Sequence, residues 1–241
     1  MPQYIRNVIR LEGDKEKIQE LLEFIKGEKS AFDFNRLIPM PDDLAIECSS
    51  RQNISFAVYL YQQMGEVQNF LQLRHNSYCK QVKKVSLPKY IDFLLQSGAA
   101  DIALGVEAYN NLKTYGHRDW YSWCLANWNT KWNALDVEYY EYANEIRFQT
   151  AWSAPVLVIE KISELFPDIT IHFLFSDEDI GVNCGELFYY ANNGKAETFI
   201  ENFSPEAYSI FVECWGASDC LAQDEKGNYY KKHCDECEDC A

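Results

Sequence analysis

The sequence of 241 residues contains no apolar run that approaches the roughly 18 uncharged residues of a membrane-spanning helix. Its first residues, MPQYIRNVIRLEGDK, lack the apolar core and the small-residue cleavage site of a signal peptide. Hydrophobic residues nevertheless make up 47% of the chain and aromatic residues 15%, which is typical of an ordered globular protein. We therefore expect a cytoplasmic protein that binds no membrane.

The sequence also lacks the motifs of common enzyme classes. It contains no His-Glu-x-x-His, no Gly-x-Ser-x-Gly and no phosphate-binding loop. Only four histidines are present, and their spacing is not that of a metal site. We therefore assign no catalytic residues and expect no cofactor, with zinc at the C-terminal cysteines as the alternative considered below.

Basic residues are scarce in the second half of the chain. Residues 135–241 contain 6 basic and 22 acidic side chains, whereas residues 1–134 contain 16 and 15, so the net charge of −15 arises in the C-terminal part. Nucleic-acid affinity depends chiefly on cations that displace counterions, so we expect no direct nucleic-acid binding. Residues 66–90 are the basic exception, and we interpret them as a solvated face, with a polyanion contact as the alternative. Their basic residues are Arg74, Lys80, Lys83, Lys84 and Lys89.

The nine cysteines are odd in number, and six of them are spread singly up to Cys220, which favours reduced thiols over a disulfide framework. Cys234, Cys237 and Cys240 are separated by two residues each, the gap that lets thiolates share one tetrahedral zinc. A fourth ligand is missing from this run, and acidic neighbours disfavour thiolates. We expect an acidic tail without stoichiometric metal. Zinc is the main alternative, and an iron–sulfur cluster is a weaker one.

Hydrophobic periodicity predicts the secondary structure. Alternating apolar residues predict strands at 4–11, 136–142, 145–152, 169–175, 184–190 and 195–201. Helical spacing predicts one helix after Gly13-Asp14, a second that begins at Ser153 and a third that begins at Ser204-Pro205. Further helices are predicted between residues 51 and 133, and the tail from Gly216 is interpreted as a loop.

Without the helical block, the order is strand-helix, strand-strand-helix-strand. That order predicts an α+β protein with a ferredoxin-like split βαβ sheet, helices on one face, and an extension by the hairpin at 184–201. Residues 40–133 then form a helical insertion after the first helix. We expect one domain over residues 1–203 and a helix with a Cys-rich acidic tail over 204–241. The fold hosts many unrelated functions and assigns none by itself.

Several dispersed motifs resemble those of the YubB-type ferredoxin-like domain family, found in proteins of plasmids, phages and integrated mobile elements. They are Trp128-Asn-Thr-Lys-Trp-Asn-Ala134, Phe148-Gln-Thr-Ala-Trp-Ser-Ala-Pro155, Leu165-Phe-Pro-Asp168, Phe34-Asn35 and Ile38-Pro-Met-Pro41. The resemblance spans residues 1–195 and implies a ferredoxin-like core with a helical insertion. The sequence departs from the family pattern at two positions: Asn129 stands where the family usually has glycine, and Ala154 stands where it usually has a second proline. The resemblance implies no catalytic residues.

Five of the six tryptophans fall between residues 120 and 152. Spacing four places Trp120, Cys124, Trp128 and Trp132 on one helical face, and we expect Trp128, Trp132 and Trp152 to be buried together. The alternative is a pocket for a flat or anionic ligand at this aromatic joint. Its candidate residues are Trp128, Asn129, Thr130, Lys131, Trp132, Asn133 and Trp152.

The acidic excess suggests a function. We expect an uncharacterised accessory protein of a mobile element, most simply a non-catalytic module that binds a basic protein through an acidic C-terminal face. The alternative is a small-ligand-binding protein or enzyme built around the tryptophan joint. Candidate partner-binding residues are Asp177, Glu178, Asp179, Glu186, Glu197 and Glu201.

Overall fold

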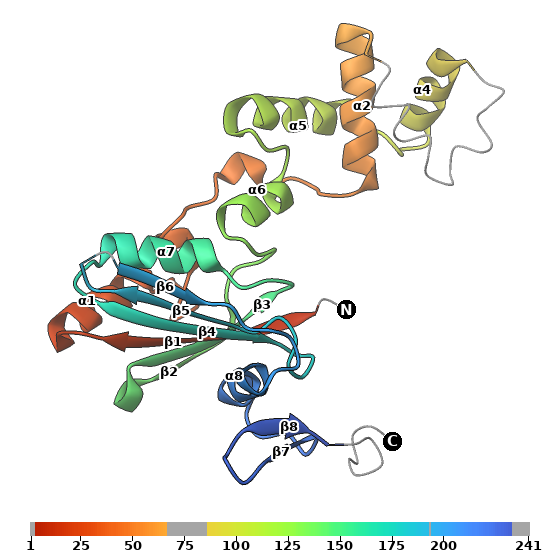
Figure 1. Cartoon of the computed structure of the whole chain (residues 1–241). Coiled ribbons are helices and arrows are strands. Elements are labelled where there is room, and N and C mark those ends of the chain that lie inside the picture. Colours follow the sequence, from red (N-terminus) through yellow and green to blue (C-terminus); the bar gives the residue numbers. More distant parts are fainter. Residues whose placement is uncertain (1–2, 67–85, 193, 233–241) are drawn as a thin grey trace. The chain divides into compact units, whose positions relative to one another are not determined.

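The computed structural model describes residues 3–66, 86–192 and 194–232 (Figure 1). A six-stranded sheet has the order β2-β3-β1-β4-β5-β6, with every neighbouring pair antiparallel. The order of the first four strands is that of a ferredoxin-like sheet, and β5 with β6 extends it, so the predicted α+β fold class is confirmed. The strands are β1 (Tyr4–Glu12), β2 (Leu135–Tyr140), β3 (Glu145–Ala151), β4 (Thr170–Asp177), β5 (Gly185–Tyr190) and β6 (Gly194–Thr198).

Helices α1 (Lys15–Ile25) and α7 (Val156–Leu165) lie on one face of this sheet (Figure 1). Asp14 caps α1 as the sequence predicts, because its side chain accepts hydrogen bonds from two backbone N–H groups of the first turn. The predicted cap of α7 is wrong. Its N-cap residue is Pro155, which makes no side-chain cap bond, while the Ser153 hydroxyl donates to the carbonyl of Asn129.

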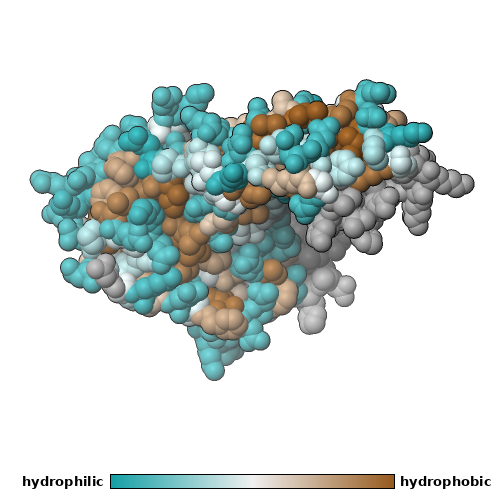
Figure 2. Space-filling view, turned by 90° about the horizontal axis from the view of Figure 1, so that it is seen from above, coloured by the Kyte–Doolittle hydropathy of each residue, from teal (hydrophilic) through white to brown (hydrophobic). Residues whose placement is uncertain are grey.

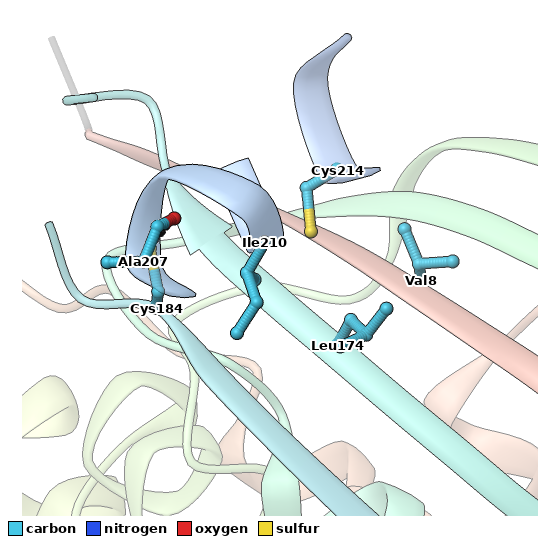
Figure 3. Close-up of a cluster of buried hydrophobic side chains, with 6 residues drawn as sticks. All are labelled: Val8, Leu174, Cys184, Ala207, Ile210 and Cys214. Atoms are coloured by element: carbon cyan, nitrogen blue, oxygen red, sulfur yellow. Dashed lines mark hydrogen bonds between the residues drawn. The ribbon is translucent and has the colours of Figure 1, made fainter. Parts of the chain in front are cut away.

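The opposite face of the sheet is also covered, contrary to the prediction of helices on one face only. Helix α8 (Pro205–Trp215) packs there across β1 and β4 (Figure 3). The sheet side of this contact is formed by Val8 and Leu174, which face each other in the β1–β4 register and are almost fully buried. Both residues interrupt the alternation of apolar and polar residues in their strands, because each strand is buried on two sides. The helix side consists of Ala207, Ile210 and Cys214.

The chain forms two units, one made of Met1–Pro39 with Leu125–Ala241 and the other of Met40–Cys124. The second unit is helical. Its helices include α2 (Ser50–Met64), α4 (Leu87–Gln96) and α5 (Ile102–Tyr115), and α6 (Trp120–Asn127) begins in it. Helices α2 and α5 approach closely at Gly105, where an added Cβ would lie 2.4 Å from the Ser55 carbonyl oxygen. Glycine is required there because any larger residue would meet backbone.

Two further predictions differ from the structure. The tail is not all loop, since β7 (Leu221–Gln223) and β8 (Tyr229–Lys231) form a hairpin after α8. Cys220 is disulfide-bonded, against the expectation of reduced thiols throughout. Cys124, Cys184 and Cys214 are buried free thiols. Most of the basic segment and the whole Cys234–Cys240 run lie outside the described residues.

Candidate partner-binding surface

The tryptophan joint is built around a turn and not around the predicted helical face. Helix α6 ends at Asn127, and residues 128–134 form a loop that leads into β2. Trp128 is buried at 4% exposure, its ring meets Phe34 edge-on at 5.6 Å, and its Nε1 donates to the Ile38 carbonyl at 2.9 Å. The helix does not continue through Trp128 and Trp132, as their four-residue spacing predicts, because Asn129 adopts a left-handed conformation with φ of 61°.

The polar candidates in this loop hold the fold together. The Asn129 side chain donates to the Ala154 carbonyl at 2.9 Å, and the Thr130 hydroxyl donates to the Ala151 carbonyl at the same distance. Asn133 accepts a hydrogen bond from the Phe34 backbone N–H at 2.9 Å and donates to Asp33 at 2.6 Å. Three of these bonds involve backbone groups around the loop and one involves the Asp33 side chain, so the polar groups already have partners within the fold. They therefore offer little to a small ligand.

Trp152 is more exposed than the sequence predicts. It is 43% exposed and takes a left-handed backbone conformation with φ of 72°, which bulky residues rarely adopt. The expectation that Trp152 is largely buried is wrong, because the reversal at the end of β3 gives this residue a left-handed backbone that does not continue the strand alternation of Phe148 and Thr150. The Lys131 ammonium lies between two rings, 4.4 Å from the centroid of Trp132 and 4.5 Å from that of Trp152. This cation–π contact orders both indoles.

The acidic candidates divide by position. Glu178 and Asp179 follow β4, and Glu201 follows β6, at the same end of the sheet. All three are exposed. The loops that carry them are joined, since the Phe203 backbone N–H donates to the Gly181 carbonyl at 2.8 Å. We call Glu178, Asp179 and Glu201 the acidic rim.

Asp177 does not belong to that surface. It is 4% exposed, and its carboxylate accepts hydrogen bonds from the Gln3 side chain at 2.8 Å and from the Asp179 backbone N–H at 3.0 Å. The same Gln3 amide also donates to the Asp179 carboxylate at 2.9 Å. Asp177 therefore fixes the loop of the rim to the first residues of the chain, and its role is structural.

Glu186 and Glu197 lie on opposite faces of the sheet. Glu186 faces Leu174 in the β4–β5 register, on the α8 side, and its carboxylate lies 2.8 Å from His172 Nε2. Glu197 faces Leu187 in the β5–β6 register, on the other side, and is exposed. Strand residues one apart in register point to opposite faces, so the six candidates cannot form one continuous patch.

Charge is distributed unequally between the two units. The unit that contains the sheet has 14 basic and 29 acidic residues, whereas Met40–Cys124 has 8 of each. Part of the excess is neutralised inside the sheet unit, where Arg10 reaches Glu145 at 2.7 Å and Glu213 at 2.6 Å. The pKa of Glu145 is lowered, because hydrogen bonds and charge from Arg147 and Arg10 outweigh burial, which is the largest single influence and acts to raise it. The acidic rim contains none of the ion pairs found among the described residues.

Sequence reasoning missed an open, tyrosine-lined groove of about 720 Å³ beside the start of α1. Tyr139, Tyr140 and Tyr142 line it together with Lys15 and Gln19. Tyr142 is 89% exposed. The available signal was the run of tyrosines on a strand at the edge of the sheet, followed by Asn144 in a left-handed turn. Hydrophobic patches are also visible between hydrophilic residues on the face drawn in Figure 2.

No group of three or more His, Cys, Asp or Glu side chains is arranged to hold a metal ion within residues 3–66, 86–192 and 194–232. Cys234, Cys237 and Cys240 fall outside these ranges, so the metal prediction for them stays a prediction. Over the same ranges, the helices are too short or too polar to cross a bilayer.

A match to a family model supports the fold of the sheet unit. Residues 127–211 match a family model described as the ferredoxin-like domain in Api92-like protein. A crystal structure of a protein api92 from Yersinia pseudotuberculosis is similar over 84% of this chain and 100% of that chain, with 13% sequence identity and a TM-score of 0.39. No curated protein matches the sequence. The match over residues 127–211 bears out a ferredoxin-like domain, whereas the YubB-type resemblance is not confirmed by it.

Proposed function

We propose that this chain is a non-catalytic accessory protein that binds a basic protein through the acidic rim of its sheet unit. The observation that supports this proposal is the placement of charge, since the sheet unit holds the whole acidic excess while the helical unit is neutral. Unpaired exposed carboxylates repel one another and slightly weaken folding, so a lopsided excess favours a role in solubility or in recognition of a cationic partner.

The geometry of the rim favours recognition. Its two loops are tied to each other and to the start of the chain, so Glu178 and Asp179 are held in place by Gln3 and by the Tyr4 carbonyl, which accepts from the Glu178 N–H at 3.1 Å. Ordered carboxylates lose less freedom on binding than mobile ones. Trp152 lies at the same end of the sheet, because its backbone N–H donates to the Gln3 carbonyl. Its half-exposed side chain adds an aromatic surface there.

The alternative of a small-ligand site at the tryptophan joint is disfavoured. Asn129 and Thr130 donate to backbone carbonyls, and Asn133 bonds to the Phe34 backbone and the Asp33 side chain. Lys131 already lies between Trp132 and Trp152. The proposal includes that the protein is encoded by a mobile element, which the family resemblance supports. It also includes a cytoplasmic location, which the composition of the sequence supports.

The test is capture of basic proteins from a bacterial lysate on the immobilised full chain. We expect the wild type to capture basic proteins that a Glu178→Gln, Glu201→Gln double variant does not capture. Raised salt should also release them, because exposed charges are already screened beyond about 8 Å at physiological ionic strength. A Glu20→Gln, Glu23→Gln variant is the matched control, since those exposed carboxylates on α1 give the same change in net charge. Equal capture by both variants would leave the acidic excess as a solubility feature.

A further inference from the structure

The open sheet has two edges, β2 and β6. An edge strand carries backbone N–H and C=O groups without a partner in the sheet, so it can pair with another chain unless it is blocked. Strand β2 is blocked, because its register with β3 shifts between Leu135 and Glu138 and because Asp136 has φ of 47°. A bulge of this kind bends the strand and interrupts further pairing.

Strand β6 has no such irregularity. Its register with β5 runs unbroken from the pair Glu186–Thr198 to the pair Tyr190–Gly194. All five of its residues are exposed, and none is proline. The strand therefore presents a regular, accessible edge.

The charges on β6 are self-complementary. Lys195 and Glu197 lie on the same face of the sheet, two residues apart, on either side of Ala196. If a second β6 pairs antiparallel with Ala196 opposite its own copy, Lys195 of each chain lies opposite Glu197 of the other. A shift of two residues in either direction would instead place like charges opposite each other, which is destabilising. Of these registers only the centred one places Lys195 opposite Glu197 in both directions, and it has the two-fold symmetry of an isologous dimer. Within its own chain the Lys195 ammonium also lies 3.6 Å from the Glu160 carboxylate, and both of these side chains are partly exposed.

A hydrophobic residue lies at the border of the same edge. Phe199 follows β6 directly and is 89% exposed. In the symmetric register it lies diagonal to the other chain's Lys195, within reach of that aliphatic stem. Pairing would cover this ring, and burial of apolar surface is the main favourable contribution to association.

We propose that two copies of this chain associate through their β6 strands, antiparallel and centred on Ala196, so that the two six-stranded sheets continue as one. The occupant of the edge is a second copy, because the alternating charges of β6 complement those of its own copy. The inference is independent of the acidic rim, which lies beyond the end of the strand and needs a different partner.

Sedimentation velocity of the full chain over a range of concentrations tests the proposal. We expect a concentration-dependent dimer whose dissociation constant rises at least about tenfold in Lys195→Glu and, separately, in Glu197→Lys, since each change turns two attractive cross-strand pairs into repulsive ones. Both side chains are exposed, and thermal unfolding verifies that each variant is folded. If either fails to fold, Lys195→Gln and Glu197→Gln remove the attraction without adding repulsion.

Mixing the two single variants gives the decisive measurement. A pair made of one Lys195→Glu chain and one Glu197→Lys chain joins an acid to a base at both cross-strand positions, so the mixture should form a heterodimer about as stable as the wild-type dimer. The matched control exchanges charges in the exposed turn between β7 and β8, with Glu225→Lys and Lys226→Glu, and should leave the wild-type dissociation constant unchanged. A wild-type monomer at 100 µM or higher, roughly the weak end of specific association, overturns the proposal. So does a dimer that neither single variant weakens.

Discussion

Replacing two tryptophans that come from the same aromatic segment should give very different losses of stability. Trp128 is 4% exposed and Trp152 is 43% exposed, although both stand beside the loop at residues 128–134. A buried tryptophan removes about 150–250 Å² from water. At roughly 25 cal/mol per Å², that burial contributes about 4–6 kcal/mol when complete and about half as much when half complete.

We therefore expect Trp128→Ala to lower the free energy of unfolding by about 3–5 kcal/mol, the usual cost of truncating a large buried aromatic residue. Part of this loss is the hydrogen bond from Nε1 to the Ile38 carbonyl, which would be left unpaired. Trp152→Ala should cost only about 2–3 kcal/mol, because the side chain is about half buried, no closed cavity forms and the left-handed backbone is kept. Trp128→Phe should fall between them, since it retains a ring against Phe34.

Urea unfolding followed by far-ultraviolet circular dichroism measures these losses without depending on tryptophan fluorescence. The comparison uses transition midpoints at a constant m-value, because a changed m-value would indicate that the two units no longer unfold together. If Trp152→Ala costs as much as Trp128→Ala, the exposed position of Trp152 and the account of the loop are both wrong.

Two further predictions concern ionisation and close packing. Because the pKa of Glu145 in the folded chain is lowered from its ordinary value of 4.5, its contribution to stability is present above that value and is lost as pH falls through the lowered pKa. Glu145→Gln should destabilise the chain by on the order of 1 kcal/mol at pH 7. That difference should shrink below pH 4 in urea titrations at each pH; a difference independent of pH would refute the ionic assignment. Gly105→Ala should cost about 1–3 kcal/mol by forcing α2 and α5 apart. Hydrogen exchange should then quicken in those two helices and not in the sheet, and equal protection in both proteins would contradict the close approach.

The sequence was sufficient for the strand order because local signals and global pattern agreed there. Asp14 before the apolar stripe of α1, alternating residues in β4, and Ser204-Pro205 before α8 each have one ready interpretation. The end of α6 was not predictable in the same way. Spacing four is equally compatible with a helix and with a loop whose turn depends on the backbone of Asn129, and that conformation is maintained by distant partners at residues 153 and 154.

Site residues were harder to predict, because a polar side chain can serve either the fold or a ligand and the sequence does not show which. Asn133 illustrates this, since its partners, Phe34 and Asp33, are about a hundred positions away in the chain. Asp177 illustrates the opposite error, because a run of three acids suggests a uniform surface although its first member is buried against Gln3. Tertiary contacts of high sequence separation decided both cases.

The distribution of charge looks different when it is counted for the two structural units instead of for the two halves of the sequence. Residues 1–39 belong to the sheet unit, and their Arg6 and Arg10 pair with Glu138, Glu145 and Glu213. The carboxylates of the second half therefore include some that are neutralised on the sheet face beside α8 and others that are exposed, among them those of the rim. Salt screens the buried ion pairs of the neutralised carboxylates only weakly, so these pairs continue to stabilise the fold. The interactions of the exposed rim carboxylates are weakened by solvent and by salt. The carboxylates that pair with arginine are not available to a partner, so the recognition surface is smaller than the net charge alone suggests.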